Sequence, residues 1–214
     1  MSPRLPDPDP APGLFIAFEG GDGAGKSTQA RLLARALRDQ GREVVTTRQP
    51  GGTELGVALR DLVLHGGHVS PRAEALIFAA DKAQHVTELV APALARGAVV
   101  VTDRYTDSSV AYQGAGRDLG ADEVDRLQRW AVGDLVPDLT VVVDVAAGEG
   151  RRRRGEQHDR LEREADVFHE SVRQHFLDAA AAAPERYVVL DGTLAVATLH
   201  EQVLGALRDR GWLS

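Results

Sequence analysis

The 214-residue chain contains no cysteine and no asparagine, and its only lysines are Lys26 and Lys82. Without cysteine it can form neither a disulfide nor a thiolate metal site. No apolar stretch approaches the roughly 20 residues that a membrane-spanning helix needs. The opening residues, MSPRLPDPDPAPG, lack the apolar core of a secretory signal. We therefore expect a cytoplasmic protein that does not enter a membrane, with a disordered tail over residues 1–12.

The acidic balance of the chain bears on its partners. The net charge is −7 and the pI is about 5.5. A nucleic-acid-coating protein is usually basic, so we expect no nucleic-acid partner, and any basic site must be local. Hydrophobic residues make up 43% and charged residues 27%, which is typical of a globular protein. We assign residues 13–214 to a single domain.

One motif dominates the sequence. Gly20-x-x-x-x-Gly25-Lys26-Ser27 fits the P-loop pattern without a mismatch. An apolar run (14–18) precedes it, as a buried parallel strand requires, and apolar residues at helical spacing follow it. In this setting backbone N–H groups converge on an anion at the start of a helix. The motif predicts that Lys26 reaches the β- and γ-phosphates of a nucleotide and that Ser27 ligates Mg²⁺.

The rest of the chain alternates strand and helix patterns. We predict strands over residues 43–47, 98–102, 139–145 and 187–190, and helices over residues 54–64, 71–96, 121–132, 166–183 and 194–210, the second of them kinked before Pro92. The strands are apolar throughout, which predicts an α/β fold of the P-loop NTPase type with a five-stranded parallel sheet covered by helices on both faces. Ligands then bind beyond the carboxyl ends of the strands.

Three further clusters have two interpretations each. Asp103 and Arg104 follow a predicted strand, where they form either a solvated ion pair or a phosphate contact in which Asp103 orients Arg104 or approaches Mg²⁺. Arg151–Arg154, with Arg160, form either a solvated helix face or part of a mobile lid over about residues 150–163. Phe78, with Lys82 one turn later, either packs in the core or holds a nucleobase.

Six segments resemble the thymidylate kinase family, and the resemblance covers nearly the whole chain. They are FEGGDGAGKSTQ (18–29), TRQPGGTELG (47–56), EALIFAADKAQHV (74–86), DRYTDSSVAYQGAGR (103–117), PDLTVVVDV (137–145) and HDRLE (158–162). The DRY-x-x-S-S-x-A-Y-Q run is specific to that family among P-loop kinases. The resemblance implies a bacterial-type homodimeric enzyme that uses ATP and Mg²⁺ to phosphorylate dTMP to dTDP.

The resemblance also implies roles for individual residues. The expected catalytic residues are Lys26, Asp103, Arg104 and Arg154, and Mg²⁺ is expected at Ser27 and Asp103. The expected ATP contacts are Gly20, Gly21, Asp22, Gly23, Ala24, Gly25, Lys26, Ser27, Thr28, Arg154 and Arg160. The expected dTMP contacts are Asp22 at the 3′-hydroxyl, Arg60 and Arg104 at the phosphate, Phe78, Lys82, Ser108 and Ser109 at the base, and Tyr112 near the 2′ position.

Two positions depart from the family pattern, and other functions stay open. Lys82 stands where the family usually has arginine, so one mobile ammonium replaces a planar pair of donors. Gln49 stands where many relatives have glutamate.

The main alternative to phosphorylation of dTMP is a kinase acting on another nucleoside or nucleoside monophosphate. A non-catalytic nucleotide-binding module is a further alternative. A GTPase switch would need an N/T-K-x-D motif, which this sequence lacks.

Overall fold

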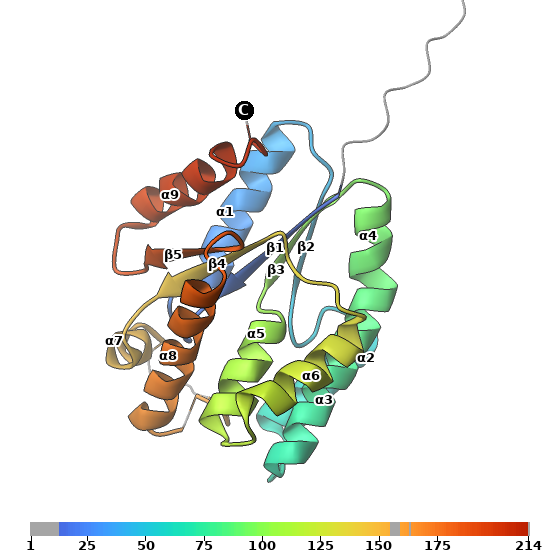
Figure 1. Ribbon diagram of the computed structural model, residues 1–214, viewed down its shortest axis with the longest axis vertical. Coiled ribbons are helices and arrows are strands. Elements are labelled where there is room, and N and C mark those ends of the chain that lie inside the picture. Colours follow the sequence, from blue (N-terminus) through green and yellow to red (C-terminus); the bar gives the residue numbers. More distant parts are fainter. Residues whose placement is uncertain (1–12, 155–158, 163, 214) are drawn as a thin grey trace, which may run out of the picture.

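A five-stranded parallel sheet forms the centre of the molecule (Figure 1). The computed structural model describes residues 13–154, 159–162 and 164–213, apart from the side chain of Arg154. The strands are β1 (Leu14–Glu19), β2 (Val44–Arg48), β3 (Val99–Asp103), β4 (Leu139–Asp144) and β5 (Tyr187–Asp191). Their order in the sheet is β2-β3-β1-β4-β5, and all four pairings are parallel. The predicted fold class is therefore confirmed.

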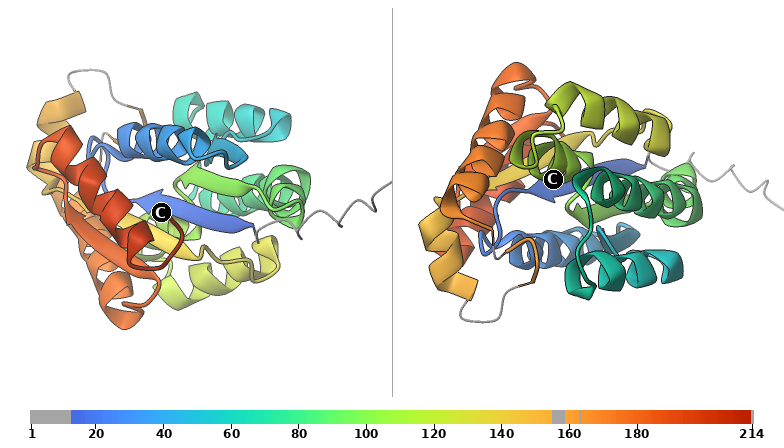
Figure 2. Two further views of the ribbon diagram at one scale, coloured as in Figure 1. Left: turned by 90° about the horizontal axis from the view of Figure 1, so that it is seen from above. Right: turned by 90° about the horizontal axis from the view of Figure 1, so that it is seen from below.

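Helices cover both faces of this sheet (Figure 2). The α-helices are α1 (Lys26–Asp39), α2 (Glu54–His65), α3 (Pro71–His85), α4 (Ala91–Ala95), α5 (Thr106–Ser109), α6 (Ala121–Val132), α7 (Ala147–Arg154), α8 (Asp166–Ala182) and α9 (Val196–Arg208). Two π-helical segments are η1 (Val86–Val90) and η2 (Val110–Gly116). None of the described helices is long and apolar enough to span a bilayer.

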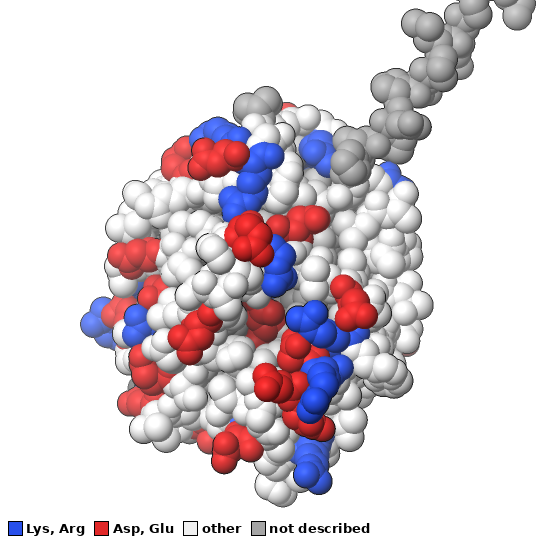
Figure 3. Space-filling view, in the orientation of Figure 1, with Lys and Arg blue, Asp and Glu red and all other residues white. Residues whose placement is uncertain are grey.

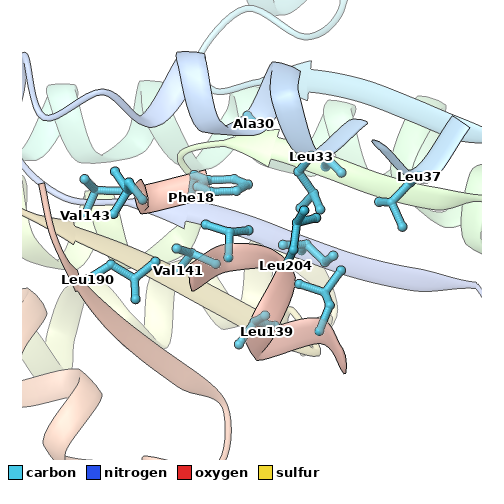
Figure 4. Close-up of a cluster of buried hydrophobic side chains, with 14 of the residues drawn as sticks. Phe18, Ala30, Leu33, Leu37, Leu139, Val141, Val143, Leu190 and Leu204 are labelled. Atoms are coloured by element: carbon cyan, nitrogen blue, oxygen red, sulfur yellow. The ribbon is translucent and has the colours of Figure 1, made fainter. Parts of the chain in front are cut away.

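The core lies on both faces of the sheet because side chains alternate along each strand. On β1, Ile16 and Phe18 belong to the cluster that also holds Leu33 and Leu37 of α1 and Leu204 of α9 (Figure 4). The intervening strand residues belong to a second cluster, packed against η1, α4 and α6. Burial on both faces explains why the strands read as unbroken apolar runs rather than as alternating ones.

The long helix predicted over residues 71–96 is instead divided into α3, η1 and α4. Pro92 has no N–H to donate to the carbonyl four residues earlier, so the regular α-helical ladder cannot continue through it. In η1 the N–H of Ala91 donates to the carbonyl of Val86, five residues back. A π-helical turn therefore replaces the predicted kink and keeps the segment continuous.

The sheet register brings the carboxyl ends of three strands together. Asp103 at the end of β3 lies opposite Phe18 of β1 on one side and opposite Arg48 of β2 on the other. Glu19 of β1 lies opposite Val142 of β4. The P-loop and the loops after β2 and β3 consequently emerge at one edge of the sheet, as the sequence predicts.

The predicted lid falls partly outside the described residues. Helix α7 covers its first part, whereas residues 155–158 and 163, like the predicted tail over residues 1–12, lie outside them. Within α7, a side chain at Gly150 would overlap the carbonyl oxygen of Asp22. The start of the lid segment therefore packs directly against the P-loop.

On the face in Figure 3, acidic and basic side chains are interspersed.

Candidate active site

The P-loop has the backbone that its glycines permit. Gly20, Gly23 and Gly25 have φ values of 126°, 79° and 103°, a region that other residues rarely adopt. A side chain at Gly20 would also overlap the carbonyl oxygen of Val143 in the neighbouring strand. Helix α1 begins at Lys26, directly after Gly25. The loop thus carries its N–H groups to a helix start, where phosphate groups bind.

Lys26 lies buried beneath this loop. Its Nζ donates to the carbonyl oxygen of Gly21 over 2.7 Å. Burial, with help from the charge of Arg104, lowers the pKa of Lys26 to about 8. The ammonium is therefore mostly charged at pH 7 and lies beside the loop that would hold a polyphosphate.

The two expected Mg²⁺ ligands lie next to each other. The Ser27 hydroxyl donates to Asp103 Oδ2. Both groups offer oxygen, the donor atom that Mg²⁺ prefers, and Mg²⁺ commonly takes only one or two protein ligands together with phosphate oxygens. The donor set therefore fits the predicted ion. The described residues contain no group of three or more His, Cys, Asp or Glu side chains that would suit a metal cage.

Two cavities adjoin at this edge of the sheet. The P-loop lines the first, and the predicted acceptor residues line the second, which we call the acceptor cavity. All eight predicted dTMP contacts line it. They come from distant segments: Asp22 from the P-loop, Arg60 from α2, Phe78 and Lys82 from α3, and Arg104, Ser108, Ser109 and Tyr112 from the segment after β3. Asp22, Gln49, Arg60 and Arg104 line both cavities. Two adjoining sites thus share one set of charged side chains.

Arg104 occupies the junction of the two cavities. Its guanidinium donates to Ser108 Oγ over 2.8 Å, to Tyr112 Oη over 3.0 Å and to the carbonyl oxygen of Gly20 over 3.2 Å, and it pairs with Asp22. Burial alone would lower the pKa of Arg104, but the surrounding acids, Asp22 first, hold it well above its ordinary value. A permanent positive charge therefore lies between the P-loop and the acceptor cavity.

The base pocket combines an aromatic ring with a buried ammonium. Lys82 Nζ lies 5.5 Å from the centre of the Phe78 ring and donates to Ser109 Oγ over 2.7 Å. Burial lowers the pKa of Lys82 to about 8. Phe78 is buried but lines the cavity, so both of its alternative roles, in the core and at the cavity, are compatible with its position.

Arg60 lacks a carboxylate partner among the described residues. It donates to the carbonyl oxygen of Pro50 over 3.1 Å. Burial and the nearby charge of Arg48 lower the pKa of Arg60. The neighbouring guanidinium groups of Arg48 and Arg60 both line the P-loop cavity, an arrangement that favours an anion between them.

Of the two lid arginines, Arg160 has a described side chain. The side chain of Arg154 lies outside the described part of the chain, so its expected role stays a prediction. Arg160 donates to the carbonyl oxygen of Val63 over 2.9 Å and pairs with the buried Glu74, which also contacts Arg117. Arg160 is not among the residues lining the P-loop cavity. A contact with ATP would require the 159–162 segment to move.

Sequence reasoning missed several residues of the acceptor cavity. Gln113 lines it, is buried, and donates to Glu74 over 2.9 Å. The signal was available, because Gln113 ends the DRY-x-x-S-S-x-A-Y-Q run. Gln49, singled out only as a departure, donates its amide N–H to Nδ1 of the buried His85 over 2.6 Å. The remaining unassigned lining residues are Pro50, Leu64, Tyr105, Asp159, Leu161 and Glu162.

These features define a class of protein. A P-loop on a parallel sheet, with a second anion-binding cavity beside it, is the arrangement of a P-loop kinase that phosphorylates a small nucleotide. The family model described as thymidylate kinase matches residues 18–203. The chain belongs to the thymidylate kinase family.

Individual relatives agree with this assignment. The chain is 55% identical over 202 residues to the thymidylate kinase of Clavibacter michiganensis subsp. michiganensis, covering 92% of this chain and 94% of the relative. It is 53% identical over 207 residues to that of Leifsonia xyli, covering 95% and 96%. The crystal structure of thymidylate kinase from Ehrlichia chaffeensis matches with a TM-score of 0.78 and 32% identity, covering 93% of this chain and all of that one.

Proposed function

We propose that this enzyme transfers the γ-phosphoryl group of ATP to dTMP, giving ADP and dTDP. The observation that carries the proposal is the pair of adjoining cavities that share Asp22, Gln49, Arg60 and Arg104. One cavity has a P-loop for a polyphosphate, and the other has guanidinium groups next to a pocket for a base. Family membership supports dTMP as the acceptor and ATP as the donor.

On the donor side, the P-loop N–H groups and Lys26 hold the β- and γ-phosphates of ATP. Mg²⁺ would be held by Ser27 and Asp103, and when bound it would neutralise phosphate charge. Arg154 lies at the end of α7, whose Gly150 packs against the P-loop. We assign Arg154 the stabilisation of charge on the transferring group, and Arg160 a contact with ATP after movement of the lid.

On the acceptor side, Arg60 and Arg104 hold the 5′-phosphate as donors of charge-assisted hydrogen bonds. Phe78 stacks on thymine, and Lys82 with Ser109 supplies polar contacts at the base edge. Ser108, already bonded to Arg104, borders the same cavity. Tyr112 Oη donates to Asp22 Oδ2 over 2.6 Å. We assign to Tyr112 the crowding of a 2′-hydroxyl and to Asp22 a contact with the 3′-hydroxyl.

The reaction is an in-line displacement. An oxygen of the dTMP phosphate attacks the γ-phosphorus, the new P–O bond forms, and the bond to the ADP oxygen breaks. No general base is required, because the attacking phosphate is largely ionised at pH 7. The protein's task is to bring two polyanions together, so Lys26, Arg60, Arg104 and Arg154 offset their repulsion.

We also propose that the enzyme is a cytoplasmic homodimer. Helix α3 packs between α2 and α6. These three helices leave large apolar side chains exposed: Leu55 and Leu62 on α2, at 46% and 53%, Leu76 on α3, at 57%, and Trp130 on α6, at 84%. Leu55 and Leu62 are seven residues apart, so they share one face of α2. Light scattering on Leu62→Glu, which should yield monomer, tests this surface.

The test of function is coupled ADP release with a panel of nucleoside monophosphates. We expect turnover with dTMP that depends on Mg²⁺ and exceeds turnover with any other acceptor in the panel. Faster turnover with a different nucleotide would favour the alternative of another nucleoside monophosphate kinase. ATP binding without turnover of any acceptor would indicate a non-catalytic module.

A further inference from the structure

We propose that Glu19 is a positioning residue that fixes the main chain of Arg104, and through it the grip on the acceptor phosphate. The inference rests on the proposed contact between Arg104 and that phosphate. Glu19 is the last residue of β1, immediately before the P-loop, and is fully buried.

The carboxylate of Glu19 binds the segment that follows β3. Its Oε1 accepts from the backbone N–H of Tyr105 over 2.7 Å and from that of Ser108 over 3.2 Å. Its Oε2 accepts from the Ser108 hydroxyl over 2.6 Å. These N–H groups lie at the start of α5, where a helix leaves backbone donors without intrahelical partners. Burying a carboxylate is costly unless donors surround it, and here three of them do.

Arg104 has a backbone conformation that needs such support. Its φ is 71°, in the left-handed region that costs a non-glycine residue roughly 1–2 kcal/mol. Three bonds hold it there: its own N–H donates to the Phe18 carbonyl over 2.9 Å, its carbonyl accepts from Thr102 Oγ1 over 2.9 Å, and the next N–H, of Tyr105, donates to Glu19. An unfavourable conformation persists at a functional site only when its surroundings impose it.

A second route from Glu19 reaches the guanidinium itself. The Ser108 hydroxyl gives its proton to Glu19 Oε2 and accepts from Arg104 NH1 over 2.8 Å. Burial, together with the charge of Asp107, raises the pKa of Glu19 to about 7. In its ionised form the carboxylate can only accept, so it dictates which way this hydroxyl points. Glutamine at this position would replace one acceptor oxygen by an NH₂ group that competes as a donor. Glu19→Gln thus keeps the size of the side chain and removes one acceptor oxygen along with the negative charge.

The test separates phosphate binding from binding of the nucleoside. Calorimetry gives the dissociation constants of thymidine and dTMP. The Kd of thymidine divided by the Kd of dTMP reports how much the phosphate strengthens binding. We expect Glu19→Gln to lower this ratio roughly 10-fold to 100-fold, because small misplacements of a binding group have effects of that size. The control is Glu43→Gln, which removes a surface carboxylate paired with Arg96 over 2.8 Å and should leave the ratio unchanged.

A double-mutant cycle shows whether Glu19 acts through Arg104. In an Arg104→Ala background, Glu19→Gln should cause no further fall in the ratio. An equal fall in both backgrounds would overturn the inference, as would an unchanged ratio in Glu19→Gln alone. If Arg104→Ala alone leaves the ratio unchanged, the proposed phosphate contact fails, and the Glu19 inference fails with it.

Loss of folding would not end the test. If Glu19→Gln does not fold, Ser108→Ala removes only the hydroxyl that links Glu19 Oε2 to Arg104 NH1. We then expect a smaller fall in the same ratio, without a matching change in the KM for ATP. A fall confined to protein yield or melting temperature, with the ratio intact, would mean that Glu19 merely stabilises the fold.

Discussion

Replacing Lys82 with methionine should make the protein more stable and a worse binder of thymidine. Lys82 is 2% exposed, and its only hydrogen bonds among the described residues go to Ser109 Oγ and, over 3.4 Å, to the Phe78 carbonyl. Burial lowers its pKa from 10.5 to about 8. At about 1.4 kcal/mol per pKa unit, keeping the charge at pH 7 costs on the order of 3 kcal/mol. Methionine fills similar space without that cost.

The pH dependence provides the decisive measurement. The unfolded chain retains the Lys82 proton up to about pH 10.5, whereas the folded chain loses it near pH 8. Between these values the unfolded state binds more protons, so stability of the unmodified protein rises with pH relative to the variant. Urea unfolding should therefore show the largest advantage of Lys82→Met at pH 7 and a shrinking one above pH 8.

The control for this experiment is Arg35→Met, which removes an exposed charge. Its side chain is 82% exposed, and we expect a change within about 0.5 kcal/mol that does not vary over this pH range. A Lys82→Met protein that is less stable at pH 7, or whose stability advantage is constant with pH, would contradict the assigned cost.

The affinity of Lys82→Met for thymidine should fall about 10-fold, since a polar group of the ligand would lose its partner. Unchanged affinity would remove Lys82 from the base site.

Three further predictions concern other parts of the site. Burial lowers the pKa of His85 to about 4. As the pH falls from 6.5 to 4, the protein should therefore lose up to about 3 kcal/mol of stability relative to His85→Gln. A stability difference between the two proteins, measured by urea unfolding, that stays constant over this pH range would refute the prediction. Gly150→Ala should raise the KM for ATP several-fold by pushing α7 from Asp22, whereas Gly148→Ala, with open space around it, should not. Arg154→Gln should lower kcat roughly 10³-fold with little change in dTMP affinity, and normal turnover would exclude a catalytic role.

Much of the fold follows from local sequence patterns. Apolar strands and helical periodicity placed the elements to within a few residues, because burial on both faces of a sheet leaves a clear signature. Thr53 shows the same at the level of one bond: threonine before a helical pattern is a typical N-cap residue, and its side chain accepts from the N–H of Gly56 over 3.0 Å.

The strand order and the long-range contacts could not be predicted in this way. The bonds from Glu19 to Tyr105 and Ser108 span 86 and 89 residues, and no local periodicity reports them. The pairing of Arg160 with Glu74 spans 86 residues and places a lid arginine beside the acceptor cavity rather than at the P-loop. Composition alone identifies a charged segment but not the surface on which it rests.

The side chains common to both cavities have a thermodynamic consequence. Asp22 and Arg104 border the donor and the acceptor, so whichever substrate arrives first alters the electrostatic field that the other meets. Such linkage is reciprocal: any factor by which dTMP changes the affinity for ATP must equal the factor by which ATP changes the affinity for dTMP. A titration of one substrate at several fixed concentrations of the other would therefore measure the coupling free energy between the two cavities, to which the side chains that line both contribute.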